Sequence, residues 1–517
     1  MYLTQGLHRA VQRHPHKIAT VDQGCEQSYE LLHRRVARLA GALAARGVRQ
    51  GDRVAMLAHN SARYVEFFLA AWWLGAAANP VNTSWSVAEI AYALKDCDCG
   101  VLLVDDQFLP LLAEIRARVD GLRLAIHGGE LPTPEGVLRY EDILAAAEPV
   151  ADGRHGGDQL AAILYTGGTT GFPKGVMLSH ANFWASSMAR MAELPNSPDG
   201  VSLIVTPMFH VAGLGRLINM LVVGGTCVTQ AQFRPDTVLR AIEAHQVTDV
   251  VLVPSMIQML IDDPLFSSDG IRSLQRIVYG AAPIAPMLLE RMLDRMPGVE
   301  FMHTYGMTET AASVSINPHF NHGAAGRASG RVRSAGRCGF GAEIRIVDSA
   351  GQELPRGTVG EIAVRGPMVM QGYWKKPAET AAALRDGWLY TGDGAYMDED
   401  GYFFVVERIK DMIISGGENV YSAEVENVII QHPAVAACAV IGVPHLTWGE
   451  AVHAVVVARP GMNVDVTELL AHCRSQLAGY KCPKSVDIRA SLPMSAAGKV
   501  LKQDLRQPFW QGQSRLA

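Results

Sequence analysis

The feature that most constrains the fold is the alternation of short apolar segments with helical patterns from about residue 27 onward. Apolar segments of strand length lie at residues 53–58, 101–104, 160–165, 202–205, 226–229, 249–253 and 276–279. Helical periodicities lie between or after them, at residues 61–74, 180–194, 235–245 and 286–296. Strands that are separated by helices usually pair in parallel, because the helix returns the chain to the same edge. The pattern therefore predicts an α/β protein with largely parallel sheets covered by helices.

The pattern changes after about residue 334. Short alternating strands with Gly-rich turns follow at residues 342–347, 360–364 and 402–406, which predicts a small, mainly antiparallel β subdomain. A compact α+β unit is then predicted from helices at 422–432 and 466–477 and strands at 435–441, 451–458 and 485–489. A chain of 517 residues is too long for one core. We therefore expect an N-terminal domain of residues 1–409, with its β subdomain at about 334–409, and a small C-terminal domain of residues 410–517 joined by a short hinge.

Composition narrows the possible partners and compartment. Lys and Arg number 46 against 51 Asp and Glu, so no basic excess favours nucleic acid. The 8 Cys are scattered, apart from Cys97 and Cys99, which favours reduced thiols over a zinc site and fits a cytoplasmic protein. Residues 1–6 lack a charged region followed by an apolar one, so no signal peptide is expected. The most apolar run, FFLAAWWLGAAA at residues 67–78, is shorter than the ~20 residues needed to span a bilayer, so we expect a core helix rather than a membrane-surface patch.

The strongest local signal is the loop YTGGTTGFPKG at residues 165–175, which an apolar strand precedes and a helix is expected to follow. Glycines let the backbone approach an anion closely, Thr hydroxyls add donors, and Lys174 supplies a cation. It is not a Walker A loop, which would need Gly at Pro173 and Ser or Thr at Gly175. A flexible surface loop is the alternative. The composition favours phosphate binding.

This loop closely resembles the phosphate loop of the adenylate-forming superfamily, which comprises acyl- and aryl-CoA synthetases, adenylation domains of nonribosomal peptide synthetases and firefly luciferase. That family usually has Ser where this chain has Gly167. The resemblance continues in order over nearly the whole chain. It is carried by PMFH (207–210), GAAP (280–283), YGMTET (305–310), YTGD (390–393), ERIKD (407–411) and PMSAAGK (493–499).

The resemblance implies that the chain binds ATP. By the matching motifs, Tyr305 stacks on adenine, Thr308 contacts the α-phosphate, Glu309 binds Mg²⁺, and Asp393 and Arg408 contact the ribose. A carboxylate suits both the hard dication and the ribose hydroxyls. The family more often has Gly at Glu407, and we expect little effect from that difference. The residues implied to hold ATP or AMP are Thr166, Gly167, Gly168, Thr169, Thr170, Gly171, Lys174, Gly280, Ala281, Ala282, His303, Thr304, Tyr305, Gly306, Thr308, Asp393 and Arg408.

The implied reaction has two steps. The substrate carboxylate attacks the α-phosphorus of ATP and expels pyrophosphate, and a thiol then attacks the acyl-adenylate. Because the reacting groups are anions, charge neutralisation must supply much of the catalysis, and the implied catalytic residues are Lys499, Glu309, Thr308, His210 and Lys174. In this family the small C-terminal domain is mobile. Rotation about Lys410 would remove Lys499 and bring coenzyme A residues to the site, namely Ser415, Gly416, Gly417, Glu418 and Asn419.

The acid is predicted from the expected pocket positions, which are mostly apolar: His210, Val211, Gly213, Leu214, Ser255, Met256, Gln258, Met259, Ala281, Ala282 and Met307. An apolar pocket favours a neutral acyl or aryl acid, because an unpaired buried charge is costly. Malonate-specific relatives place an arginine near Met259, so a dicarboxylate is disfavoured unless Arg216 points inward. We expect a medium- or long-chain fatty acid, with an aryl acid of the benzoate or hydroxycinnamate type as the alternative.

The acyl acceptor and the class of reaction are less closely determined by the motifs. Coenzyme A is the favoured acceptor, but a free-standing enzyme that loads a carrier protein would carry the same motifs. A luciferase-like oxygenase also needs adenylation. A non-catalytic nucleotide-binding protein is expected to lack Lys499, Glu309 or Asp393, and all three are present. The sequence leaves open whether the chain forms a homodimer.

Overall fold

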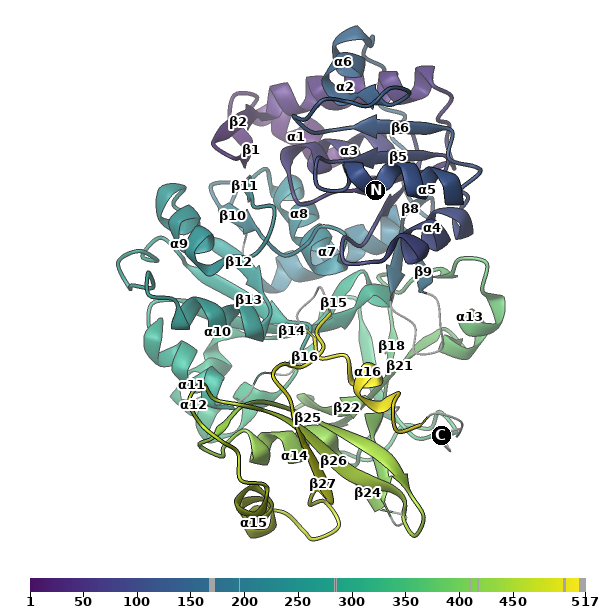
Figure 1. The fold of residues 1–517 in the computed structure, drawn as a ribbon. Coiled ribbons are helices and arrows are strands. Elements are labelled where there is room, and N and C mark those ends of the chain that lie inside the picture. Colours follow the sequence, from purple (N-terminus) through teal and green to yellow (C-terminus); the bar gives the residue numbers. More distant parts are fainter. Residues whose placement is uncertain are drawn as a thin grey trace.

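The structure is a computed structural model that describes residues 1–166, 173–194, 196–282, 284, 286–408, 411–415, 418–495 and 499–510. Within these residues the strands form two large, mostly parallel sheets and two five-stranded sheets. Figure 1 shows the N-terminal part in purple and blue at the top and the C-terminal unit in yellow-green at the bottom. The fold is therefore the expected α/β architecture with a smaller C-terminal unit.

The first large sheet has the order β16-β15-β14-β13-β12-β10-β11-β1-β2 and is parallel from β14 to β1. Its strands are β1 (Ile18–Asp22), β2 (Cys25–Ser28), β10 (Val201–Ile204), β11 (Thr226–Thr229), β12 (Asp249–Leu252), β13 (Arg276–Gly280), β14 (Glu300–Met307), β15 (Ala312–Asn317) and β16 (Arg337–Cys338). The helices that alternate with its strands are α8 (Val211–Val223), α9 (Pro235–Ala244), α10 (Pro254–Asp262) and α11 (Pro286–Arg295).

The second large sheet has the order β19-β9-β8-β4-β3-β5-β6-β7 and is parallel from β8 to β7. Its strands are β3 (Arg53–Leu57), β4 (Ala77–Pro80), β5 (Val101–Val104), β6 (Leu124–His127), β7 (Leu138–Arg139), β8 (Leu160–Thr166), β9 (Lys174–Ser179) and β19 (Gly372–Tyr373). The helices in this part of the chain are α1 (Gln5–Arg13), α2 (Tyr29–Ala45), α3 (Ala62–Trp73), α4 (Val87–Asp96), α5 (Leu112–Arg118), α6 (Tyr140–Ala146) and α7 (His180–Glu193).

The largest apolar core contains residues of both large sheets together with helices α2, α3, α7 and α8. The apolar run expected to form a core helix lies in α3, where Phe67, Phe68 and Trp72 are fully buried. Among the described residues, no helix combines the length and apolar character that crossing a membrane requires.

Capping residues mark the start of helix α7 and the end of helix α8. At α7, Ser179 and Asn182 form a reciprocal cap in which each side chain accepts a hydrogen bond from the backbone amide of the other. Helix α8 begins directly after His210 and ends at Gly224, whose positive φ of 81° suits glycine. The helix expected at residues 180–194 is α7, but the sequence did not predict strand β9, which lies between the loop and this helix and forms a hairpin with β8.

The antiparallel region consists of β17 (Glu343–Val347), β18 (Gly360–Arg365), β20 (Leu384–Arg385), β21 (Trp388–Met397) and β22 (Phe403–Arg408). All of their pairings are antiparallel, as the alternating pattern predicted. Strand β19, from the same part of the sequence, instead leaves this sheet and pairs with β9. The pairing places Tyr373 of β19 next to the hairpin formed by β8 and β9. Helices α12 (Ala324–Ala328) and α13 (Pro377–Ala383) flank the region.

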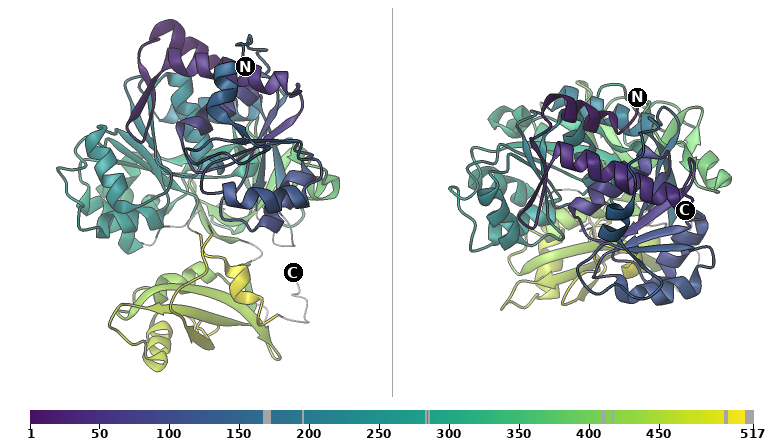
Figure 2. Two further views of the ribbon diagram at one scale, coloured as in Figure 1. Left: turned by 45° about the horizontal axis from the view of Figure 1, so that its top comes forward. Right: turned by 90° about the horizontal axis from the view of Figure 1, so that it is seen from above.

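The C-terminal unit is a five-stranded sheet with helices, which Figure 2 (left) shows below the rest of the chain. Its elements are β23 (Ile413–Ser415), β24 (Glu418–Val420), α14 (Ser422–Ile429), β25 (Val435–His445), β26 (Gly449–Ala458), α15 (Val466–Gln476), β27 (Ser485–Ile488) and α16 (Lys502–Arg506). It has its own apolar core, centred on β25, β26 and α14. An α+β unit was expected here.

Candidate active site

The ends of the phosphate-loop hairpin lie opposite each other, because Thr166 on β8 pairs with Lys174 on β9. The loop residues Gly167, Gly168, Thr169, Thr170 and Gly171 lie outside the described residues, so their proposed phosphate contacts stay predictions. The hairpin nevertheless fixes where the loop starts and ends, and it places Lys174 at the mouth of the loop.

Lys174 and Glu309 are joined through Tyr373, which sequence reasoning missed. The Lys174 Nζ lies 5.0 Å from the centroid of the Tyr373 ring, and the Tyr373 hydroxyl donates a hydrogen bond of 2.9 Å to the Glu309 carboxylate. Strand β19 carries Tyr373 and pairs with β9 beside Lys174. The contact spans 64 residues of sequence, and no local motif marks it. The predicted metal ligand and the predicted phosphate cation are therefore neighbours.

Glu309 lies in a 3-10 turn, Thr308–Thr310, rather than in an exposed helix start. The turn is fixed by the Thr310 hydroxyl, which accepts from the Met307 amide at 3.0 Å and donates to the Ala312 carbonyl at 2.8 Å. Glu309 is only 7% exposed. Among the described residues, no group of three His, Cys, Asp or Glu could hold a metal ion by itself. A single carboxylate beside a triphosphate fits Mg²⁺, which commonly takes one or two carboxylates plus phosphate oxygens and water.

Two glycines allow the close backbone approaches that shape this region. A Cβ on Gly306 would lie 1.7 Å from the Ala312 carbonyl oxygen, and one on Gly280 would lie 2.3 Å from the Thr304 carbonyl oxygen. Strand β13 ends at Gly280 opposite Thr304 on β14, and Ala281 follows with a φ of 64°. The chain thus turns sharply at the segment that was predicted to lie along adenine, and the predicted residue Ala282 comes next.

Tyr305 and Asp393, predicted to contact adenine and ribose, are in direct contact. The Tyr305 hydroxyl donates a 2.6 Å hydrogen bond to an Asp393 carboxylate oxygen. Asp393 also pairs across strands β21 and β22 with the backbone of Arg408, whose side chain lies outside the described part. These three predicted nucleotide residues come together although they are up to 103 positions apart in sequence (408 − 305).

His303 is half-buried on β14, opposite Tyr279 on the strand that leads into the predicted adenine segment. Its ring stacks on Tyr279 with centroids 4.9 Å apart, and its Nδ1 donates to the Ser334 carbonyl at 3.0 Å. Burial lowers the pKa of His303, so the ring is neutral at pH 7 and Nε2 is an acceptor. The contacts support a packing role beneath the nucleotide site.

His210 and Lys499 are close enough to influence each other electrostatically. Burial, and after it the charge of Lys499, lowers the pKa of His210 to about 4. The His210 Nε2 is buried and has no hydrogen-bond partner among the described residues. The C-terminal unit therefore brings Lys499 within electrostatic range of His210, the residue that precedes α8.

The predicted acyl-pocket residues come from three elements. Val211, Gly213 and Leu214 lie in the first turns of α8, Ser255, Met256 and Met259 in α10, and Met307 at the end of β14. Leu214 and Met256 are buried, whereas the Met259 side chain is 44% exposed and Gln258 bonds to Asp262 on its own helix. The structure therefore does not bring Met259 and Gln258 into an enclosed pocket.

Arg216 does not point inward toward the acid, which the sequence had left open. Its guanidinium donates to Ser202 Oγ and Asn196 Oδ1, both at 2.8 Å, and lies 3.8 Å from Asp249. These contacts give it a structural role at the start of β10 and β12.

Glu407, from which little effect was expected, makes contacts that the sequence did not predict. Glu407 is 8% exposed and accepts hydrogen bonds from both the amide and the hydroxyl of Ser422 at the start of α14. Lys502 lies 3.6 Å away and also pairs with Glu426 at 2.7 Å. The side chain therefore links the antiparallel sheet to the C-terminal unit.

The predicted coenzyme A residues lie on the hairpin of β23 and β24. Ser415 and Glu418 pair across it, Ser415 being buried and Glu418 exposed. Gly416, Gly417 and the predicted hinge residue Lys410 lie outside the described residues. The hydrogen bonds and ion pairs of the described residues do not connect Ser415 or Glu418 with the adenylation residues, so their role stays a prediction.

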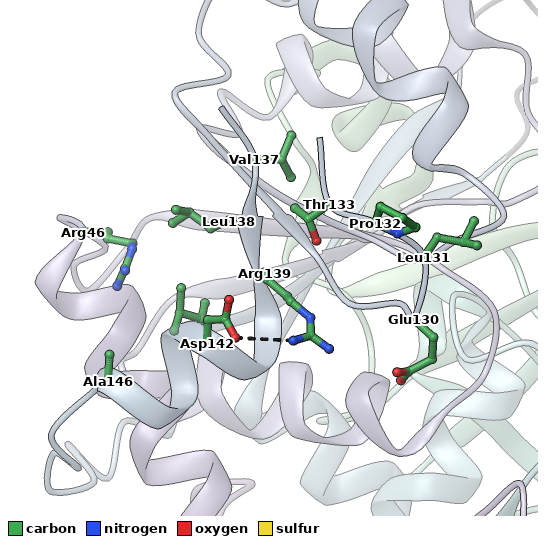
Figure 3. A pocket seen from close by; sticks show the side chains of 11 residues that line it. Arg46, Glu130, Leu131, Pro132, Thr133, Val137, Leu138, Arg139, Asp142 and Ala146 are labelled. Atoms are coloured by element: carbon green, nitrogen blue, oxygen red, sulfur yellow. Dashed lines mark ion pairs between the residues drawn. The ribbon is translucent and has the colours of Figure 1, made fainter. Parts of the chain in front are cut away.

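A surface pocket of about 590 Å³ contains none of the motif residues. Figure 3 shows it beside β7 and α6, with an ion pair of 3.5 Å between Arg139 and Asp142. It is lined by Arg46, Glu130, Leu131, Pro132, Thr133, Val137, Leu138, Arg139, Asp142, Ile143 and Ala146.

Comparisons with known proteins agree with the motif assignment. Residues 7–374 match the family model described as AMP-binding enzyme, and residues 424–499 match the AMP-binding enzyme C-terminal domain. A feruloyl-CoA synthase of Amycolatopsis sp is 41% identical, with 97% of this chain and 98% of that protein covered. The fatty acid–[acyl-carrier-protein] ligase ScoC of Streptomyces coeruleorubidus is 35% identical, with 98% and 96% covered. The crystal structure of ATP-bound MatB from Rhodopseudomonas palustris is similar with a TM-score of 0.89 and 34% identity, covering 98% of this chain and 99% of that one.

The matched family models span more than half of the chain, and the similarity to these proteins extends over almost its whole length. The chain therefore belongs to the AMP-binding enzyme family within the adenylate-forming superfamily, and it is an AMP-forming acid–thiol ligase.

Proposed function

We propose that the chain converts an aryl carboxylic acid of the hydroxycinnamate type into an acyl-adenylate and transfers the acyl group to coenzyme A. The observation that carries this proposal is the 41% identity over nearly the full length of a feruloyl-CoA synthase, compared with 35% for a fatty acid–carrier-protein ligase. The aryl alternative thus moves ahead of the medium- or long-chain fatty acid.

The contacts of the site support the first half-reaction. Lys174 at the loop hairpin and Lys499 near His210 are placed to offset the negative charge that builds up when a carboxylate approaches ATP. Glu309, oriented by Tyr373, would hold Mg²⁺, which when bound neutralises phosphate charge. Tyr305 and Asp393 form the nucleoside side of the site.

His210 would contact the acid as a neutral ring. With a pKa of about 4 it carries no charge at pH 7, so it orients the carboxylate by hydrogen bonding and does not neutralise it. The Lys499 ammonium supplies the charge instead. His210 would thus orient the substrate carboxylate, and Lys499 would neutralise its negative charge.

For the second half-reaction we propose that the C-terminal domain, residues 410–517, rotates about Lys410 relative to residues 1–409. The rotation would withdraw Lys499 and bring the Ser415–Glu418 hairpin to the acyl-adenylate, with Gly416 and Gly417 leaving room for the thiol arm of coenzyme A. The separate core of the C-terminal unit supports movement as one body.

The test is a panel of acids assayed for pyrophosphate release and for thioester formation. The panel contains benzoate, cinnamate, 4-hydroxycinnamate, hexanoate and palmitate, each with coenzyme A, with an acyl carrier protein and with neither. We expect the largest kcat/KM for a hydroxycinnamate with coenzyme A. Turnover of fatty acids alone would overturn the aryl assignment, and thioester formation only on the carrier protein would overturn coenzyme A as acceptor.

A further inference from the structure

Arg190 on α7 is a buried arginine without a carboxylate partner. Its side chain donates hydrogen bonds to two backbone carbonyls, from Nε to Ser186 at 3.3 Å and from Nη2 to Gly215 at 3.0 Å. Arg190 is 8% exposed, and no Asp or Glu of the described residues forms an ion pair with it. Burial and the nearby charge of Arg216 lower its pKa to about 9.

The contrast with Arg216 shows that this is unusual. Arg216 is similarly buried, but its charge faces Asp249 and two polar side chains. Buried charges in proteins are normally paired, because removing a charge from water is costly. Arg190 is therefore a buried arginine whose charge no carboxylate of the described residues neutralises.

Three further polar groups on α7 and α8 also lack partners. Ser186 Oγ, Ser187 Oγ and Asn219 Oδ1 are buried and accept or donate no hydrogen bond within the described residues. A buried polar atom without a partner costs on the order of 1–3 kcal/mol, so such groups normally face bound water or a ligand.

The helices bring these groups to one place. Arg190 contacts α8 at Gly215, Ser186 lies one turn before Arg190, and Asn219 lies one turn after Gly215. The helices run antiparallel: Leu3 bonds to His180 at the start of α7, while Gly6 lies against Leu221 near the end of α8. Ser186 therefore faces the same part of α8 as Asn219.

This polar cluster lies where α8 passes the chain segment that follows the Glu309 turn. A Cβ on Gly215 would lie 2.9 Å from Arg190 Nη1 and 3.4 Å from the Cβ of Ala312, which follows the Glu309 turn. Gly215 is five residues along α8 from His210, or about 7.5 Å at the rise of an α-helix. His210 lies near Lys499 just before α8, so an aryl acid whose carboxylate meets His210 would extend along α8 toward the cluster.

We propose that Arg190, Ser186, Ser187 and Asn219 form the polar end of the acyl site and bind the phenolic hydroxyl of the aryl acid. The guanidinium would donate a hydrogen bond to the phenolic oxygen, and Asn219 Oδ1 or a serine oxygen would accept a hydrogen bond from the phenolic hydroxyl. An alkyl terminus would leave all of these groups unpaired. The inference rests on the proposed aryl acid substrate. It identifies the phenolic hydroxyl as the group by which the site would recognise that acid.

The test compares two acids that differ only in the hydroxyl, 4-hydroxycinnamate and cinnamate. In Arg190→Met we expect the KM for 4-hydroxycinnamate to rise by about tenfold or more, because a site built to bind a hydroxyl loses its main donor. The KM for cinnamate should change less than about threefold. Arg63→Met, which removes an arginine far from the site that pairs with Glu130 and Glu141, is the matched control and should change neither value.

Asn219→Leu tests the same site from helix α8 and should also raise the KM for 4-hydroxycinnamate but not for cinnamate. If Arg190→Met does not fold, the result for Asn219→Leu is the test of the inference. Equal losses for both acids in the folded variants, or no loss for either, would overturn the inference and leave the aryl assignment in place. A wild-type preference for 4-carboxycinnamate would overturn it in favour of a carboxylate occupant. If the wild type activates no aryl acid, the substrate proposal itself fails.

Discussion

Glu407 accepts two hydrogen bonds from Ser422, one from its backbone amide at 2.6 Å and one from its hydroxyl. Glu407 lies near the end of β22 in the antiparallel sheet, shortly before the predicted hinge, and Ser422 begins α14 of the C-terminal unit. These hydrogen bonds therefore stabilise the arrangement of the C-terminal unit in which Lys499 lies near His210. A rotation about Lys410 would have to break them, because Glu407 and Ser422 lie on opposite sides of that residue in the chain.

Replacing Glu407 should shift the balance between the two half-reactions. In Glu407→Gln we expect acyl-adenylate formation to slow by about tenfold, because hydrogen bonds to a charged group contribute about 1.5–3 kcal/mol. Thioester formation from supplied acyl-adenylate should be unchanged or faster. Single-turnover kinetics of each step measures the split. Glu424→Gln, which removes an exposed pairing with Lys481, is the control. Equal slowing of both steps would show that Glu407 does not selectively stabilise the arrangement in which Lys499 lies near His210.

Lys499→Ala should abolish acyl-adenylate formation and spare the second step. The Lys499 ammonium acts electrostatically on His210, so its loss leaves the approaching carboxylate without that neutralisation. Pyrophosphate release and thioester formation from synthetic acyl-adenylate are measured separately. Lys484→Ala, an exposed lysine of the same unit, should behave as the wild type. A loss of the same size in both steps would contradict the assignment.

Tyr373→Phe tests the contact that positions Glu309. Removing the hydroxyl leaves the buried carboxylate short of one hydrogen bond, and we expect kcat/KM for adenylation to fall about tenfold, with a weaker apparent affinity for Mg²⁺. A titration of initial rate against Mg²⁺ measures both. Tyr396→Phe, whose ring stacks on Phe404 away from this site, is the control. Unchanged Mg²⁺ dependence would mean that Tyr373 does not orient the ligand.

Gly306→Ala should be strongly destabilising. Its Cβ would lie 1.7 Å from the Ala312 carbonyl oxygen, so the backbone at the Glu309 turn has to move. We expect the free energy of unfolding to fall by roughly 2 kcal/mol or more, as measured by chemical denaturation. Gly298→Ala is the matched control, because nothing lies within 4 Å of the added methyl group. Similar losses for the two variants would contradict the steric argument.

The neutral state of His210 predicts a pH dependence of stability. Its native pKa of about 4 lies below the ordinary value of 6.5, so the unfolded state binds more protons between these values. The free energy of unfolding should therefore fall as the pH drops from 6.5 toward 4, by on the order of 1–3 kcal/mol from this residue. His180 and His322 share the trend, so the measurement is the difference between wild type and His210→Asn. Parallel pH profiles would show that His210 is protonated as easily when folded as when unfolded.

Local sequence was sufficient to predict several strands and helices closely, although these are fewer than half of the elements in the described residues. The strands predicted at residues 101–104 and 226–229 match β5 and β11, and α3 matches the helix predicted at residues 61–74 within one residue at each end. These elements depend on periodicity and on caps such as Ser61, which act over a few residues. Strand β9 was missed because it has only six residues and is followed directly by a helix. So short a segment does not show a strand periodicity that can be told apart from the first turn of that helix.

The sequence by itself determined the alternation of strands and helices, the family motifs and the residue types at the site, because these can be recognised from near neighbours in the chain. Only the tertiary structure decided which distant side chains meet. The contact of Tyr373 with Glu309 spans 64 residues, and that of Glu407 with Ser422 joins the antiparallel sheet to the C-terminal unit. The polar groups of α7 and α8 look ordinary in sequence. They become unusual only in the packed structure, where Arg190 meets no carboxylate and Ser186 Oγ and Asn219 Oδ1 meet no hydrogen-bond partner among the described residues. The cost of a buried polar group depends on its surroundings and not on its neighbours in the chain.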